Sequence, residues 1–241
     1  MLIEFFWVFP VISASTWLTT LSGMLGHWYM MGEPTFGRMQ PGQTIPFISD
    51  IGAQQLKPLF MIGSFITMFF MNVTFYQFVH YKEHVNSLFV YISFLFAMLG
   101  SVGLITLSVF DNLDHLFLHD TSVTIFLTGY LVSAAVICMD YFYLRASNRV
   151  NKRMLMTSFM IKITFVIVEL AFIVAFRILA AGGNLQSDTA AVLEWIIAFT
   201  FTGYILSFII DLLPSSQKFP DSHQYQQLEM GMDTSSSRLM I

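Results

Sequence analysis

The feature that most constrains this chain is a series of long runs without charged side chains. Residues 5–26 contain no Asp, Glu, Lys or Arg, and the same holds for 59–79, 88–110 and 121–139. A helix needs about 20 apolar residues to cross the hydrocarbon core of a bilayer. We therefore predict an all-α polytopic membrane protein, a bundle of six transmembrane helices. The expected spans are 5–26, 59–79, 88–110, 121–139, 158–181 and 194–213.

The composition supports a membrane protein and excludes several other classes. Of the 241 residues, 56% are apolar and 11% are charged, against about 25% charged residues in soluble domains. The net charge of -4 is spread over loops and ends, so no basic face is available for nucleic acid. No nucleophile elbow or phosphate loop occurs. We expect no enzymatic activity, no cofactor and no bound metal.

The Lys and Arg residues near the span ends predict the orientation. Seven lie in the second loop, the fourth loop and the tail: Lys82, Arg145, Arg149, Lys152, Arg153, Lys218 and Arg238. The other side has only Arg38, Lys57 and Arg177. The positive-inside rule then places both termini in the cytosol. The long loop 27–58 becomes luminal or extracellular, and 214–241 becomes a flexible cytosolic tail.

The fourth loop gathers four of these bases. Arg145, Arg149, Lys152 and Arg153 are expected to face anionic cytosolic lipid, at about 1 kcal/mol per charge. Membrane lipids are therefore the first partners we expect.

Two charged residues fall inside the fifth span. Glu169 lies about 16 Å along that helix from its predicted start, close to mid-depth, and Lys162 is seven residues earlier on about the same face. A charge at this depth is costly and is a candidate functional group. Glu169 is either a proton or ion relay or a buried carboxyl that bonds a neighbouring helix, and Lys162 could reach partway toward it.

The last span is bracketed by Glu194 and Asp211, about 26 Å apart along the helix. That separation excludes a catalytic carboxylate pair. We expect each acid at a membrane interface, with Glu194 in the first helical turn and Trp195 in an aromatic belt.

The third loop brings His115, His119 and Asp120 close together. The two histidines are four residues apart, which would place two metal ligands on one helical face, but no third ligand is evident. In an acidic compartment they would instead act as a pH sensor. The structural alternative is that Asp120 caps the fourth span and His119 packs at the interface.

The tail contains Tyr225-Gln-Gln-Leu228, a Tyr followed three residues later by a bulky aliphatic. This pattern resembles the signals that sorting adaptors read on endosomal and lysosomal proteins. Sorting adaptors are the second class of partner that we expect.

Several motifs together resemble the FRAG/DRAM/Sfk group of membrane proteins, and most closely its damage-regulated autophagy modulator (DRAM) branch. They are Phe9-Pro10, the loop element Pro46-Phe47-Ile48-Ser49-Asp50-Ile51-Gly52, His119-Asp120, and the last span from Glu194-Trp195 to Asp211. The resemblance covers the six-span core, and the loop element is its most specific part.

The resemblance implies a six-span protein of lysosomes and endosomes that promotes autophagy without being an enzyme. Related branches imply alternatives: a plasma-membrane regulator of phosphatidylinositol 4-kinase recruitment or lipid asymmetry, or a transporter or lipid-remodelling protein. Within the loop element, Pro46 fixes a turn, Asp50 can accept main-chain hydrogen bonds, and Gly52 permits a backbone conformation closed to other residues. We expect a rigid loop on the luminal membrane face.

Overall fold

The structure is a computed structural model, and it describes residues 5–36, 39, 41–81, 87–111, 114–144, 152–181 and 188–213. Over these residues the chain forms seven α-helices and no β-strand. The helices are α1 (Val8–Met30), α2 (Ile48–Gly52), α3 (Lys57–Tyr81), α4 (Ser87–Val109), α5 (Leu116–Leu144), α6 (Lys152–Ala181) and α7 (Asp188–Leu212).

Six of the seven helices are long and apolar enough to cross a membrane, which confirms the predicted fold class. The seventh, α2, is a five-residue helix inside the first loop. The last three spans begin earlier than predicted: α5 at Leu116, α6 at Lys152 and α7 at Asp188. The prediction followed the apolar runs, whereas a helical backbone continues through charged residues at either membrane surface.

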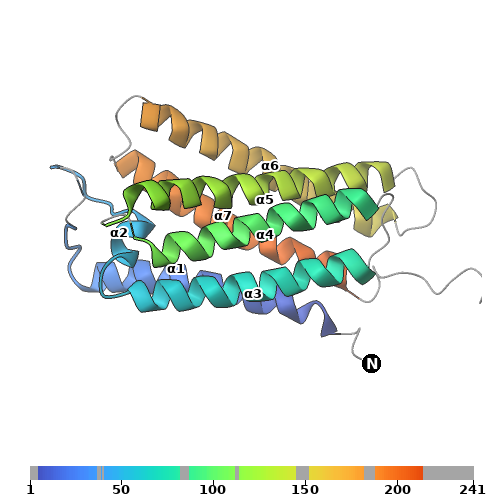
Figure 1. Cartoon of the computed structure of the whole chain (residues 1–241), viewed down its shortest axis with the longest axis horizontal. Helices are drawn as coiled ribbons and strands as arrows, with labels where there is room; N and C mark the ends of the chain where they lie inside the picture. Colours follow the sequence, from blue (N-terminus) through green and yellow to red (C-terminus); the bar gives the residue numbers. More distant parts are fainter. Residues whose placement is uncertain are drawn as a thin grey trace, which may run out of the picture.

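The long helices run up and down beside one another (Figure 1). α1 begins and α7 ends at one end of the bundle, and α2 lies at the opposite end. An even number of spans requires the first span to begin and the last span to end on the same side of the membrane, as they do here. The end that carries α2 is the end that the charge distribution assigns to the lumen or the cell exterior.

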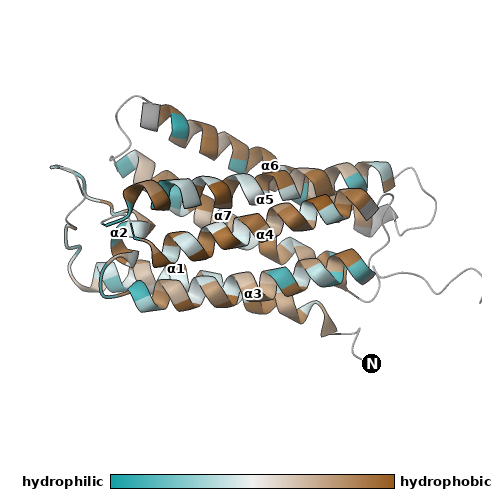
Figure 2. Ribbon diagram, viewed as in Figure 1, coloured by the Kyte–Doolittle hydropathy of each residue, from teal (hydrophilic) through white to brown (hydrophobic). Residues whose placement is uncertain are grey.

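The long helices carry apolar residues along their length (Figure 2). On α3, for example, Ile62, Phe65 and Phe69 are each more than half exposed. These residues recur at helical spacing, so they form one outward-facing stripe. Such a surface is suited to lipid, since in water it would be a large unpaired apolar patch.

Small residues hold α4 and α5 close together. A Cβ added to Gly129 would lie 2.7 Å from the backbone nitrogen of Gly100, and one added to Gly103 would lie 2.6 Å from the backbone nitrogen of Phe126. The Ser93 hydroxyl also lies 3.0 Å from the hydroxyl of Ser133. Small residues of α4 and α5 therefore serve packing within the molecule.

The last span is the centre of the bundle. Half of α7 is buried, and it contacts α1, α3 and α6 as well as α2. The indole nitrogen of Trp17 on α1 donates a 2.9 Å hydrogen bond to the Ala198 carbonyl of α7. Contacts with α7 therefore position both the short helix α2 of the first loop and the span α6.

Candidate functional site

The first loop is fastened to the beginning of α7 by Asp188. One carboxylate oxygen of Asp188 accepts hydrogen bonds from the backbone amides of Thr44, at 2.7 Å, and Ile45, at 2.8 Å. The other oxygen accepts a 2.8 Å bond from the Thr44 hydroxyl. Hydrogen bonds to a charged acceptor are stronger than neutral ones. Asp188 therefore anchors the loop from a residue about 140 positions away along the chain.

The loop element that carries the family resemblance contacts α7 at two further points. The backbone amide of Ile48 donates a 3.0 Å hydrogen bond to the Glu194 carboxylate. The indole nitrogen of Trp195 donates a 2.9 Å bond to the Pro46 carbonyl. We call this assembly, residues 44–52 held by Asp188, Glu194 and Trp195, the loop clamp. It unites two motifs that lie far apart in the sequence.

These contacts correct two expectations about the last span. Glu194 is not in the first turn of its helix, because α7 begins at Asp188, which is the acid of the first turn. Trp195 is buried beneath the loop and only 6% exposed, so it is not an exposed member of an aromatic belt. Both side chains serve the clamp instead.

Inside the loop element, Asp50 behaves as predicted and Gly52 does not. A carboxylate oxygen of Asp50 accepts a 3.2 Å hydrogen bond from the Phe47 amide at the start of α2. Gly52 is not among the glycines with a positive φ. A Cβ at this position would instead lie 2.7 Å from Cδ1 of Phe60. Gly52 is needed because α2 packs closely on α3.

The burial of the loop element fits a rigid cap on the bundle. Pro46, Ile48 and Asp50 are buried, whereas Phe47 and Ser49 are half-buried. The alternation leaves one side of the element available at the end of the bundle. A second link at this end is the 2.7 Å ion pair between Lys57 and Asp111, which joins the start of α3 to the third loop.

The opposite half of the molecule holds a buried ion pair that the sequence did not reveal. Nζ of Lys162 lies 2.8 Å from Oδ2 of Asp211, and both side chains are fully buried. Lys162 also donates a 2.7 Å hydrogen bond to the Ser207 hydroxyl and lies 4.0 Å from the ring centroid of Phe208. Lys162 therefore reaches α7 and does not pair with Glu169.

Asp211 is surrounded by further donors. Its Oδ1 accepts hydrogen bonds from the Tyr141 hydroxyl of α5, at 2.5 Å, and from the Ser158 hydroxyl of α6, at 2.8 Å. Asp211 is one residue from the end of α7, but its side chain lies in the interior and not at an exposed interface. The cluster joins three helices and pairs the charge of Lys162 with that of Asp211, as a structural junction does.

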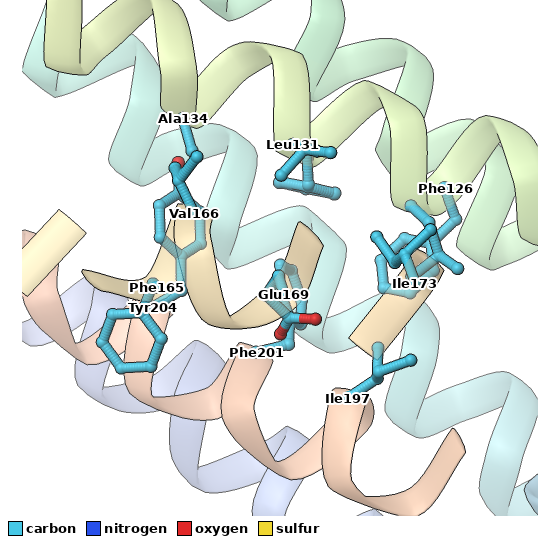
Figure 3. A pocket seen from close by; sticks show the side chains of 12 residues that line it. Phe126, Leu131, Ala134, Phe165, Val166, Glu169, Ile173, Ile197, Phe201 and Tyr204 are labelled. Atoms are coloured by element: carbon cyan, nitrogen blue, oxygen red, sulfur yellow. The ribbon is translucent and has the colours of Figure 1, made fainter. Parts of the chain in front are cut away.

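Glu169 has no such partner. Both carboxylate oxygens are buried and neither makes a hydrogen bond with the described part of the chain. The carboxyl lies in a cavity of about 40 Å³ between α5, α6 and α7, lined otherwise by apolar and aromatic side chains (Figure 3). The expectation that it bonds a neighbouring helix is therefore wrong.

The two histidines of the third loop differ in their exposure. His119 is buried, and its Nδ1 lies 3.1 Å from the Phe110 carbonyl, whereas His115 is exposed and packs edge-on against the Phe110 ring. Asp120 does not cap α5, because that helix begins four residues earlier. Among the described residues, no group of three or more His, Cys, Asp or Glu side chains could hold a metal ion.

Several predicted features lie outside what the structure describes. Tyr225 and Leu228 of the tail signal, and Arg145 and Arg149 of the basic loop, fall in undescribed segments. The backbones of Lys152 and Arg153 begin α6, but their side chains are not described.

Sequence reasoning missed Asp188, Ser158 and Ser207. A signal for Asp188 was present, since an acid before an apolar run is typical of a helix start. Ser158 and Lys162, like Ser207 and Asp211, are four residues apart and share a helix face. That spacing indicates polar faces on both helices but does not reveal that the two faces meet.

The fold and these contacts define a class of six-span helical membrane protein whose first extramembrane loop is fastened to its last span. The family model described as "Frag1/DRAM/Sfk1/Cwh43P N-terminal domain" matches residues 5–215. The chain belongs to this family, as its motifs predicted. The comparisons with curated proteins and with solved structures gave no significant match.

Proposed function

We propose that this protein is a non-enzymatic membrane protein of lysosomes and endosomes that modulates autophagy, as the DRAM branch of its family does. The family match covers nearly the whole helical core. The loop element 46–52 is the part of the chain that most resembles that branch. Lipids are the proposed partners of the bundle, and sorting adaptors are the proposed partners of the Tyr225 signal.

The loop clamp is the observation that carries this proposal. Ile48 and Pro46 of the loop element are bonded to Glu194 and Trp195 of the last span, so both family motifs form one unit at one end of the bundle. Phe47 and Ser49 of the loop element are partly exposed there. This surface is where we place the contact with other components of the membrane.

The ionisable groups of both described clusters are engaged in contacts within the chain. The buried ionisable cluster around Asp211 is occupied by its own hydrogen bonds. The loop clamp uses its carboxylates to hold backbone amides.

The test begins with location and follows with autophagic flux. Tagged wild-type protein is compared with Tyr225→Ala and with the matched control Gln226→Ala, scored against lysosomal and plasma-membrane markers. We expect wild type and the control on lysosomes and Tyr225→Ala shifted to the cell surface. In cells that lack the protein, we expect turnover of autophagosomes to fall and the wild-type chain to restore it.

Two results would contradict the proposal. One is residence of the wild-type protein at the cell surface, which would favour the alternative of a plasma-membrane regulator of phosphatidylinositol 4-kinase recruitment or lipid asymmetry. The other is unchanged autophagosome turnover in cells that lack the protein.

A further inference from the structure

Helix α6 is attached to the bundle less firmly than the other spans. Only 6% of its span is buried inside the molecule, against 39–50% for the other five. Its polar attachment is near its beginning, where Ser158 and Lys162 contact Asp211. Toward its other end, α6 leans away from α5 (Figure 1). A crevice between α5, α6 and α7 therefore lies along the part of α6 beyond the ion pair.

This crevice contains Glu169, the residue of the described transmembrane core whose two carboxylate oxygens are both buried without a hydrogen-bond partner. Figure 3 shows the Glu169 carboxyl at the centre of the cavity, between side chains of α5 and side chains of α7. The cavity is partly open to the outside of the bundle. The outer side of α6 next to it is apolar and exposed, as at Ile167 and Leu170, so the opening faces the lipid.

No basic side chain of the described residues is available to Glu169. Lys162, seven residues earlier on about the same face of α6, is bonded to Asp211 and Ser207. Arg177 is exposed and eight residues further on, about 12 Å along the helix axis. A carboxyl in an apolar site is stabilised most by a cation or a strong hydrogen-bond donor. Among the described residues, Glu169 therefore has no cationic partner, which leaves its carboxyl open to a donor from outside the chain.

The lining of the cavity indicates which donor fits. Five aromatic rings surround the carboxyl, from α5, α6 and α7: Phe126, Tyr130, Phe165, Phe201 and Tyr204. The faces of aromatic rings attract alkylammonium groups, and a carboxylate adds a charged acceptor. A phosphate or carboxylate head would instead bring like charges together.

The size of the cavity sets a second limit. The cavity volume of about 40 Å³ is a few times the roughly 10–15 Å³ that one water-sized group requires by the same measure. It admits an ammonium group but not a phospholipid headgroup, a sugar or a packed helix. The rest of a bound ligand must extend through the opening into the lipid, so that part must be an apolar chain.

We propose that the crevice between α5, α6 and α7 binds single-chain lipophilic amines, with the ammonium group on Glu169 and the alkyl chain along α6. Both a long-chain base of the membrane and a cationic amphiphile from the aqueous phase have this chemistry. The site is separate from the loop clamp and does not depend on the organelle in which the protein resides.

The test uses the purified full-length chain in nanodiscs of phosphatidylcholine, with radiolabelled dodecylamine as the probe. We expect saturable binding to wild type and at least about tenfold weaker binding to Glu169→Gln, which keeps the shape of the side chain and removes its charge. Asp120→Asn is the matched control, since it makes the same charge change at an exposed position on α5 and should bind as wild type does.

A second variant and two competitors define the ligand. Ala134→Phe fills the cavity from α5 without changing its charge, and it should also abolish binding, whereas Glu169→Asp should retain part of it. Unlabelled sphingosine should compete with the probe, and dodecyl phosphate should not. Thermal unfolding of each variant in the same nanodiscs shows whether it is folded.

Equal dodecylamine binding by wild type and a folded Glu169→Gln would overturn the proposal. So would competition by dodecyl phosphate as effective as that by sphingosine. If dodecylamine binds but sphingosine does not compete, the site takes aqueous cationic amphiphiles only, and the assignment to a membrane long-chain base is wrong.

Discussion

At the scale of single residues, the buried charges of Lys162 and Asp211 compensate each other in the interior of the bundle. Asp211 faces one ammonium group and two hydroxyl donors. Lys162 has a carboxylate, a hydroxyl and the face of an aromatic ring. A buried pair of this kind is costly to break from one side, because the remaining charge loses its partner without regaining water.

The first prediction concerns this pair. Asp211→Asn should reduce the free energy of unfolding by about 3 to 5 kcal/mol, since it leaves Lys162 as an unpaired buried charge. Lys162→Met combined with Asp211→Asn should restore much of that loss. Unfolding curves in detergent measure the stability of the single variant and of the double variant. Equal stability of wild type and the single Asp211→Asn variant would show that the pair is not formed.

The second prediction concerns the contact between α2 and α3. Gly52→Ala should cost about 1 to 3 kcal/mol, because the new methyl group would meet the Phe60 ring at 2.7 Å. Gly26→Ala is the matched control: it is also helical but has nothing within 4 Å, so it should be neutral or stabilising. Phe60→Leu in the Gly52→Ala background should recover stability. Similar unfolding curves for both glycine variants would argue against close packing here.

At the scale of elements, α7 organises the molecule from both of its ends. Its beginning holds the first loop through Asp188, Glu194 and Trp195. Its end holds α5 and α6 through Asp211. The two attachments explain why the first loop stays in place and why α6, although little of its span is buried, remains part of the bundle.

The third prediction follows from the loop attachment. Asp188→Ala removes three hydrogen bonds, so the amides of Thr44 and Ile45 should exchange with deuterium about tenfold faster or more. The exchange of α4 and α5 should stay unchanged. Asp120→Ala serves as the control, and mass spectrometry of the exchanged peptides provides the measurement. Unchanged exchange at Thr44 and Ile45 would contradict the role given to Asp188.

At the scale of the whole molecule, the sequence predicted the fold better than it predicted the contacts. Six spans followed from the apolar runs, because crossing lipid constrains length and composition directly. The partner of Lys162 did not follow, since Glu169 lies on the same helical face while Asp211 is on another helix, and only helix rotation and packing decide between them. The loop element was recognised, but its docking on Glu194 and Trp195 depends on a contact nearly 150 residues apart.

The measurement that tests the role of the loop clamp most directly combines Asp188→Asn and Trp195→Phe, which weaken the carboxylate acceptor and remove the indole donor of the clamp. Cells that lack the protein are given either this double variant or wild type, and autophagosome turnover and lysosomal location are scored together. The account predicts a double variant that reaches lysosomes at the wild-type level but restores less than about half of the turnover. Full restoration of turnover, with faster deuterium exchange showing that the loop is released, would contradict it.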